Sequence, residues 1–195
     1  MCPNCEKAAI GGMTHPLCKK RYGLDGLWSL GIYQDPLKKA IQKLKYKFVS
    51  QIAETLLDLM IVYWAKHIPQ FLEEIKKDKG VGWVVVPVPL HPKRQKWRGF
   101  NQSALLGKML SQKLGMEYAE ALKRTRYTKP QVGIKAWERK QNMHNAFAPN
   151  LKFKIENLKF LLVDDVWTTG STLKECAYVL KKGGAQKVWA ITLAR

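Results

Sequence analysis

The sequence has few acidic residues and no long hydrophobic run. Asp and Glu number 15 against 34 Lys and Arg, so the formal net charge at pH 7 is +19. The most apolar stretch, residues 56–65, contains Asp58 and is too short to cross a bilayer, and the first residues lack the apolar core of a secretory signal. These absences predict a cytoplasmic protein with no membrane insertion.

Internal repeats and low-complexity tracts are also absent, and 46% of the 195 residues are hydrophobic. A chain of this length and composition can bury a core, and we expect one domain with a small appendage. The excess of positive charge has two interpretations that composition leaves open. It indicates either a polyanionic partner, such as nucleic acid, a nucleotide or pyrophosphate, or a solvated lysine-rich surface. The basic residues concentrate in 38–47, 93–98 and 123–140.

Cysteine is scarce, with four residues in the chain, and three of them lie among the first 18 residues. In a cytoplasmic protein, closely spaced cysteines indicate metal ligands or redox groups before disulfides. Cys2 and Cys5 form one pair, and His15 and Cys18 form a second pair with the same spacing. Two such pairs separated by a short loop are typical of a structural zinc site, whereas a reduced and frayed N-terminus is the alternative. We expect a zinc-finger-like module in residues 1–24 and a second domain in residues 25–195.

The hydrophobic pattern of the remaining chain predicts an α/β fold. Residues 82–90 and 160–165 are continuous apolar runs of the kind found in strands that are buried on both faces of a parallel sheet. A helical pattern over 173–182 and a strand at 188–193 follow the second run, which indicates a parallel strand–helix–strand unit. We expect further strands at 27–33 and 116–122, and helices at 36–47, 49–79 with a break at Pro69, 101–114 and 136–142.

Two acids and a hydroxyl-rich loop follow the second buried run. Asp164 and Asp165 come at its carboxyl end, where ligands bind in open parallel sheets, and residues 168–172 lead into the next helix. Gly170 allows a ligand to approach the backbone closely, and the helix N-terminus favours a phosphate. Carboxylates accept hydrogen bonds from vicinal hydroxyls and help to hold a hydrated Mg²⁺. This combination predicts a site for a 5-phosphoribosyl group; the alternative is a helix cap beside a turn.

The segment Val163-Asp-Asp-Val-Trp-Thr-Thr-Gly-Ser-Thr172 resembles the 5-phosphoribosyl-1-pyrophosphate (PRPP) motif of type I phosphoribosyltransferases. Residues 87–94 and 98–103 resemble the ComF branch of that superfamily. The same branch is indicated by Lys123, Arg124, Thr128, Gln131, Arg139, Asn142, Ala146 and Phe147. The resemblance covers nearly the whole chain. It implies a parallel-sheet type I phosphoribosyltransferase-like fold with a small N-terminal zinc-binding module, and PRPP or a nucleotide as a ligand together with Mg²⁺.

The resemblance also implies roles for individual residues. It makes Asp164 and Asp165 the catalytic pair. The residues implied to bind the 5-phosphoribosyl group are Asp164, Asp165, Val166, Thr168, Thr169, Gly170, Ser171 and Thr172. The pyrophosphate side is implied to contain Lys93, Arg94 and Arg98. Gln131 and Arg139 are implied to belong to a mobile loop, residues 124–147, that closes over the site.

The N-terminal cysteines depart from the pattern of the family. ComF-like proteins often begin with two Cys-x₂-Cys pairs, but here Arg21 occupies the place of the fourth cysteine. His15 would therefore have to complete the zinc site. The expected ligands are Cys2, Cys5, His15 and Cys18.

Two functions remain open at this point. One is a phosphoribosyltransferase that uses PRPP and Mg²⁺ with an acceptor that the sequence does not name. The other is a non-catalytic protein that binds single-stranded DNA, with the 5′-phosphate in the pocket and the basic segments 38–47 and 123–140 along the backbone. Aromatic residues among these charges either stack on bases or pack into the core: Tyr46, Phe48, Tyr127 and Trp137. ComF-like proteins are linked to DNA uptake in natural transformation, which implies helicase and recombination proteins as further partners.

Overall fold

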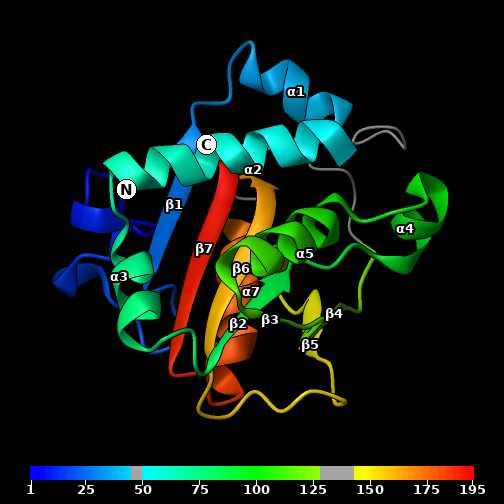
Figure 1. Ribbon diagram of the computed structural model, residues 1–195. Helices are drawn as coiled ribbons and strands as arrows, with labels where there is room; N and C mark the ends of the chain where they lie inside the picture. The colour runs from blue at the N-terminus through cyan, green and yellow to red at the C-terminus, as the bar shows by residue number, and fades with distance from the viewer. Residues whose placement is uncertain (45–49, 128–142) are drawn as a thin grey trace.

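The computed structural model describes residues 1–44, 50–127 and 143–195. Its centre is a five-stranded sheet in the order β1-β7-β6-β2-β3, in which each neighbouring pair is parallel (Figure 1). The strands are β1 (Gly26–Gly31), β2 (Trp83–Pro87), β3 (Glu117–Tyr118), β6 (Lys159–Val166) and β7 (Lys187–Ala194). The α/β class and the parallel sheet expected from the sequence are confirmed.

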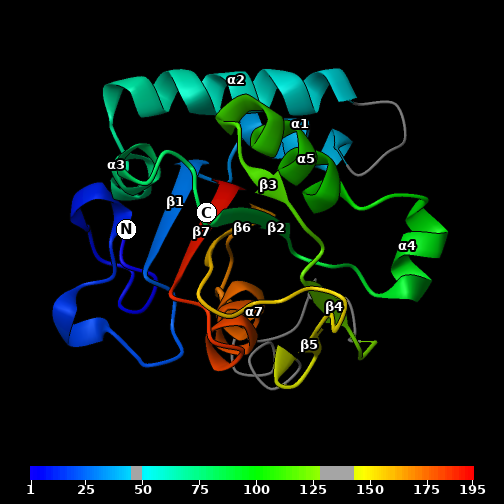
Figure 2. The ribbon, with the colours of Figure 1, turned by 60° about the horizontal axis from the view of Figure 1, so that its bottom comes forward.

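Helices cover both faces of this sheet (Figure 2). One face carries α1 (Leu37–Lys43), α2 (Ser50–Lys66), α3 (Gln70–Lys77) and α5 (Gln102–Leu114). The other face carries α7 (Ser171–Lys182) and a small antiparallel sheet of β4 (Leu122–Arg124) and β5 (Phe147–Pro149). The break expected at Pro69 is confirmed, because that residue separates α2 from α3.

The two cores follow from the alternation of side chains along the central strands. Val85 and Leu161 belong to the core under α2, α3 and α5, whereas Val84 and Leu162 belong to the core under α7. Because both faces are covered, the middle of each central strand is mostly apolar, and all five residues of β2 are buried. The carboxyl ends of β2 and β6 emerge at one edge of this double core.

The basic segment after β2, where the sequence pattern predicted no helix, contains the short helix α4 (Pro92–Arg98). Its ends explain why it forms. His91 Nδ1 accepts a hydrogen bond from the Lys93 amide at 3.2 Å, Pro92 occupies the first helical position, and Gly99 closes the helix with φ of +82°. None of the residues of α4 is buried, so the helix has no apolar periodicity by which the sequence could have revealed it.

The region around residues 123–150, for which we expected a mobile loop and one helix but no strand, contributes most of β4 and all of β5. Each of these strands is three residues long, too short for a recognisable period. The helix expected at 136–142 lies outside the described residues, as do Tyr46, Phe48 and Trp137.

Residues 1–24 precede the first strand and contain two short 3₁₀ helices, Ile10–Gly12 and Pro16–Cys18. An isolated bridge between Met13 and Gly26 connects this segment to the edge of the sheet. In the parts of the chain that the structure describes, no helix is long and apolar enough to span a membrane.

Candidate functional site

A cavity of about 910 Å³ lies at the carboxyl ends of β2 and β6. The end of β6 contributes Asp164 and Asp165, and the following loop contributes residues 166–168 and 170–173. Helix α4 and the first turn of α5 also line the cavity. Ligands of open parallel sheets bind in this position, so the cavity is the candidate functional site.

The acid pair lies at the floor of the cavity and is held by α5. Oδ1 of Asp164 accepts hydrogen bonds from Ser103 Oγ and from the Asp165 amide, each at 2.9 Å. Burial, reinforced by the nearby charge of Asp165, raises the pKa of Asp164 to about 7, although the hydrogen bond from Ser103 lowers it. Asp164 is therefore close to half-protonated at neutral pH, and a cation or a hydroxyl donor would favour its ionised form.

Trp167 supports the hydroxyl-rich loop from beneath. Its side chain is 3% exposed, and a Cβ atom added to Gly170 would lie 2.2 Å from Cζ2 of the Trp167 ring. Gly170 also has φ of +69°, a conformation that other residues rarely adopt. Both constraints require glycine at this position. Trp167 therefore packs under the loop at Gly170.

The loop presents its hydroxyls at the N-terminus of α7. Thr169 Oγ1 and Ser171 Oγ share a hydrogen bond at 2.8 Å, and Gly170 takes the N-cap position without a side-chain cap. The first backbone N–H groups of a helix have no acceptor within the helix and point outward from its N-terminal end, where they favour an anion. The loop therefore has the donors that a phosphate group requires.

Positive charge on α4 forms a basic wall of the cavity. Lys93, Arg94 and Arg98, which the resemblance places on the pyrophosphate side, all line the cavity. Gln131 and Arg139, together with the rest of segment 128–142, lie outside the described residues.

The structure places Arg124 at the cavity; the resemblance gave it no individual role, although it begins the loop 124–147 that was expected to close over the site. Arg124 is 9% exposed, and its charge lowers the pKa of Asp164. It occupies one of the buried positions of β4, where an arginine is rarely found without a charged partner. A buried arginine in a strand is a signal for a site, but β4 itself was not predicted. Gln102 and Ser103 also line the cavity and were not included in the expected site. They are polar residues in the first turn of α5, where polar residues are common at the start of any helix.

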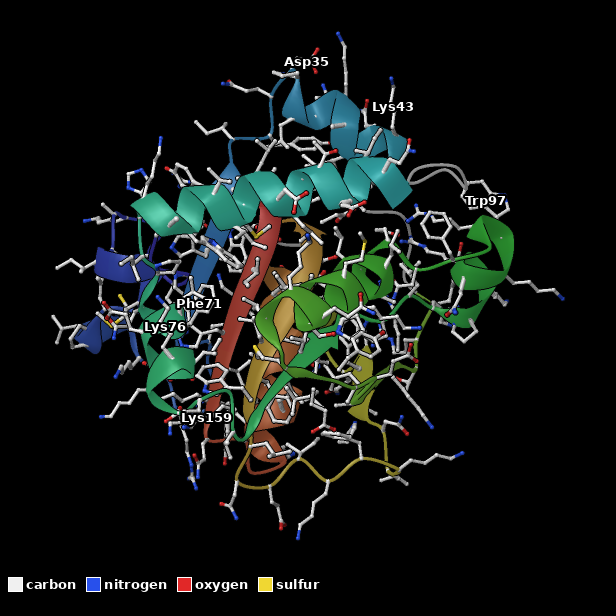
Figure 3. All side chains as sticks on the ribbon, in the orientation of Figure 1. Asp35, Lys43, Phe71, Lys76, Trp97 and Lys159 are labelled. Atoms are coloured by element: carbon white, nitrogen blue, oxygen red, sulfur yellow. The ribbon has the colours of Figure 1, made fainter. Side chains whose placement is uncertain are left out.

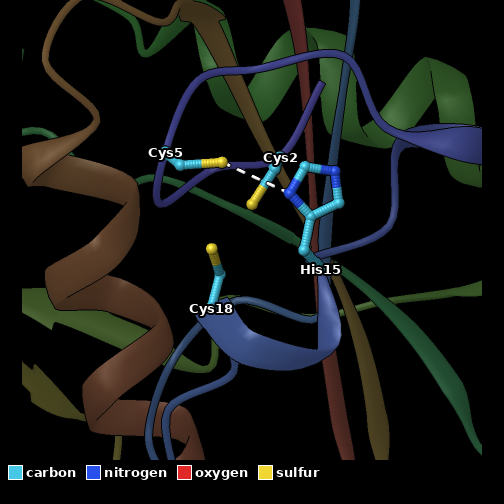
Figure 4. A group of neighbouring side chains, drawn as sticks. All are labelled: Cys2, Cys5, His15 and Cys18. Carbon is cyan, nitrogen blue, oxygen red and sulfur yellow. Dashed lines mark hydrogen bonds between the residues drawn. The ribbon is translucent and has the colours of Figure 1, made fainter.

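The four N-terminal ligand candidates form a second cluster (Figure 4). The ligand atoms of Cys2, Cys5, His15 and Cys18 lie within 4.8 Å of one another. Nε2 of His15 donates to the Ala8 carbonyl at 2.8 Å, so Nδ1, 3.3 Å from Cys5 Sγ, carries the lone pair that faces the thiols. The cluster could hold a metal such as zinc.

The pKa values of the thiols reflect this crowding. Burial raises the pKa of Cys2, but hydrogen bonds from the amides of Cys5, His15 and Asn4 outweigh it and lower the pKa to about 6. Burial and the neighbouring thiols raise the pKa of Cys18 to about 11. The thiols thus compete for negative charge in a small space, and a bound cation such as zinc would allow all of them to ionise together. Arg21 does not enter the cluster, because its guanidinium lies over the Tyr22 ring, 5.2 Å from the centroid.

The parallel sheet, the acid pair and the loop before α7 define a phosphoribosyltransferase-like protein, and residues 101–195 match the family described as "Phosphoribosyl transferase domain". The chain is 35% identical to "Competence protein F" of Haemophilus influenzae over 91% of its length and 76% of that protein. It is 34% identical to "DNA utilization protein YhgH" of Escherichia coli (100% and 84%) and 28% identical to "Competence protein ComFC" of Streptococcus pneumoniae (100% and 80%). The chain belongs to the ComF family.

Proposed function

We propose that the cavity binds the 5-phosphoribosyl group of PRPP, or of a nucleotide, together with Mg²⁺. The observation that carries the proposal is the placement of a partly buried acid pair beside a hydroxyl-rich helix N-terminus in one cavity. The loop residues 168–172 would hold the 5-phosphate. Asp164 and Asp165 would accept hydrogen bonds from the ribose hydroxyls, and waters on Mg²⁺ would contact the same carboxylates.

The basic wall fits the leaving side of a phosphoribosyl transfer. Arg94 and Arg98 would bind pyrophosphate oxygens through their planar guanidinium groups, and Lys93 would add a point charge. Transfer would require a nucleophile at C1 of the ribose, and catalysis would come from positioning and from stabilising the positive charge that develops there. The residues that line the cavity do not identify the acceptor substrate of such a transfer.

We propose a role in the uptake or use of DNA, because relatives carry the names competence protein and DNA utilization protein. A second candidate function, favoured by the net charge of +19, is binding of single-stranded DNA with its 5′-phosphate in the loop 168–172. Of the basic segment 38–47, the structure describes Lys38, Lys39 and Lys43 on α1, and Lys39 forms an ion pair with Asp35 at 3.0 Å.

We also propose that residues 1–24 form a structural zinc module attached to the phosphoribosyltransferase-like domain of residues 25–195. The support is the fit of the cluster: four ligand atoms within 4.8 Å, and an imidazole whose second nitrogen is engaged by a backbone carbonyl.

Two assays distinguish the enzyme from the DNA-binding protein. Release of pyrophosphate from PRPP, followed with a nucleotide or an oligonucleotide as acceptor, is expected for the transferase. Competition between PRPP and oligonucleotides that end in a 5′-phosphate or in a 5′-hydroxyl tests the alternative. If only the 5′-phosphate oligonucleotide displaces PRPP, the pocket holds the end of a strand. If neither PRPP nor the phosphorylated strand binds, both forms of the proposal fail.

A further inference from the structure

Trp97 is the most exposed aromatic residue at the cavity and belongs to α4, a helix with no buried side chain. It is 84% exposed, lines the cavity, and projects from α4 at the outer edge of the molecule (Figure 3). Its neighbours along the helix are basic and include no acid: Lys93, Arg94, Lys96 and Arg98. Burial therefore does not explain a tryptophan here, and its exposure indicates a contact with something outside the chain.

A second aromatic ring, Tyr127, lies at the same cavity among the same cations. It is 53% exposed, its ring is 5.1 Å from that of His91, and the charged ends of Lys93 and Arg94 lie 5.7 and 5.9 Å from its centroid. The rim thus alternates aromatic rings with positive charges.

This alternation selects one class of partner. A membrane surface or a protein helix would require an apolar face, and α4 offers Trp97 alone in a run of cations. Single-stranded nucleic acid needs both features, because its unpaired bases stack on aromatic rings while its phosphates take the charges. A duplex would offer only phosphates, since its bases are stacked inside.

We propose that α4 and Tyr127 form a docking surface for single-stranded DNA, with a base stacked on Trp97 and phosphates on Lys93 and Lys96. The proposal rests on the role in DNA uptake or use given above, but not on PRPP binding. Because Trp97 and the acid pair line one cavity, a strand docked here lies at the mouth of the proposed phosphoribosyl site.

The stacking contact is tested by comparing Trp97→Ala, Trp97→Phe and a matched control, Tyr178→Ala. Tyr178 is also exposed beside a lysine, with Lys182 Nζ 5.8 Å from its centroid, but it does not line the cavity. Affinity for a fluorescent single-stranded oligonucleotide is expected to fall about tenfold in Trp97→Ala, because stacking on an aromatic ring contributes that much per base. Trp97→Phe should retain most of the affinity, and Tyr178→Ala all of it.

Two changes to the ligand sharpen the test. The wild-type protein should bind an abasic oligonucleotide of equal charge more weakly than it binds the normal strand. The Trp97→Ala variant should bind the abasic and normal strands with equal affinity. Duplex DNA should bind both proteins equally. Equal loss for abasic and normal strands, or an unchanged affinity in Trp97→Ala, would overturn the proposal, as would capture of the wild-type protein but not Trp97→Ala by anionic vesicles.

The salt dependence of binding distinguishes the contribution of charge from that of base stacking. Lys96→Gln should reduce the slope of log affinity against log salt by about 0.7, whereas Trp97→Ala should lower affinity at every salt concentration without changing the slope. Titration of the wild-type protein with PRPP and Mg²⁺ is read separately. A protein that fails to bind PRPP but shows the stacking pattern refutes the phosphoribosyl site alone, and the reverse result refutes the docking surface alone.

Discussion

Gln102 connects the acid pair to the basic wall of the cavity. Its Nε2 donates to Oδ2 of Asp165 at 3.1 Å, and its Oε1 accepts from Nη1 of Arg98 at 2.7 Å. A carboxylate only accepts and a guanidinium only donates, so the two partners fix the orientation of the amide. Gln102 is 5% exposed, which keeps water from replacing either bond. One side chain therefore positions groups on the proposed ribose and pyrophosphate sides together.

Gln102→Leu should weaken binding of PRPP with Mg²⁺ by about tenfold while the protein stays folded, because a leucine of similar size keeps the packing but removes both hydrogen bonds. The matched control is Gln112→Leu, which changes an exposed residue of the same helix. Calorimetric titration of both variants measures the effect. Equal affinities for the two variants would show that Gln102 does not position the site.

The raised pKa of Asp164 predicts that the protein loses stability as the pH rises. An aspartate in the unfolded chain titrates near pH 4, whereas Asp164 in the folded protein titrates near 7. Between these two pH values the folded state holds a proton that the unfolded state has lost. The free energy of unfolding therefore falls as the pH rises from about 4 to about 7, by roughly 4 kcal/mol in total. Asp164→Asn lacks the titration, so the difference in melting temperature between the variant and the wild type should grow in favour of the variant across that interval.

Ligand binding should show the opposite pH dependence. If the ionised form of Asp164 accepts the ribose hydroxyls, affinity for PRPP with Mg²⁺ should rise as the pH approaches 7 and level off above it. A pH-independent affinity between pH 5 and pH 8 would argue against a role for the Asp164 carboxylate.

The sequence predicted the central strands well because burial on both faces gives each of them a continuous run of mostly apolar residues. Residues 160–165 and 188–193 fall inside β6 and β7, and residues 82–90 contain β2. The acid pair and the loop could be placed at a strand end for the same reason. Because β2 and β6 are parallel neighbours, the acid pair and the loop lie at the same edge of the sheet as the segment that follows β2.

Other parts of the site leave little trace in the sequence. Helix α4 buries nothing, so its cap residues rather than its periodicity define it. Arg124 enters the cavity from a three-residue strand whose pairing partner is distant in the chain, and Gln102 acts through hydrogen bonds that depend on tertiary contacts. Hydrophobic patterns along the chain indicate which residues are buried. They do not indicate residues whose position depends on strand pairing or hydrogen bonds with distant parts of the chain.

Substitution of Gly170 should disrupt the loop more than strain alone would. Gly170→Ala places a methyl group against the Trp167 ring and requires φ of +69°, whereas Gly115→Ala requires a similar φ of +63° with nothing within 4 Å. The control should cost about 1 kcal/mol of unfolding free energy, and Gly170→Ala should cost more and also lose PRPP binding. Equal melting temperatures and intact binding in both variants would contradict the packing described for Trp167.

The N-terminal cluster should bind about one zinc ion per chain in protein purified without chelators. His15→Ala should lower the zinc content and the melting temperature, because the imidazole supplies the fourth ligand. Arg21→Ala is the matched control and should keep its zinc, since Arg21 lies over Tyr22. Full zinc occupancy in His15→Ala would exclude the imidazole as a ligand.

The most direct test of the account is calorimetric titration of the wild-type protein and of Asp164→Asn/Asp165→Asn with PRPP in the presence of Mg²⁺. The control is Asp58→Asn, which removes an exposed acid paired with Lys113 away from the cavity. We predict that the wild type and the control bind PRPP and that the double variant, although folded, does not, because it lacks the carboxylates proposed to accept the ribose hydroxyls. Undiminished PRPP affinity in the double variant, or no binding by the wild type, would contradict the phosphoribosyl site.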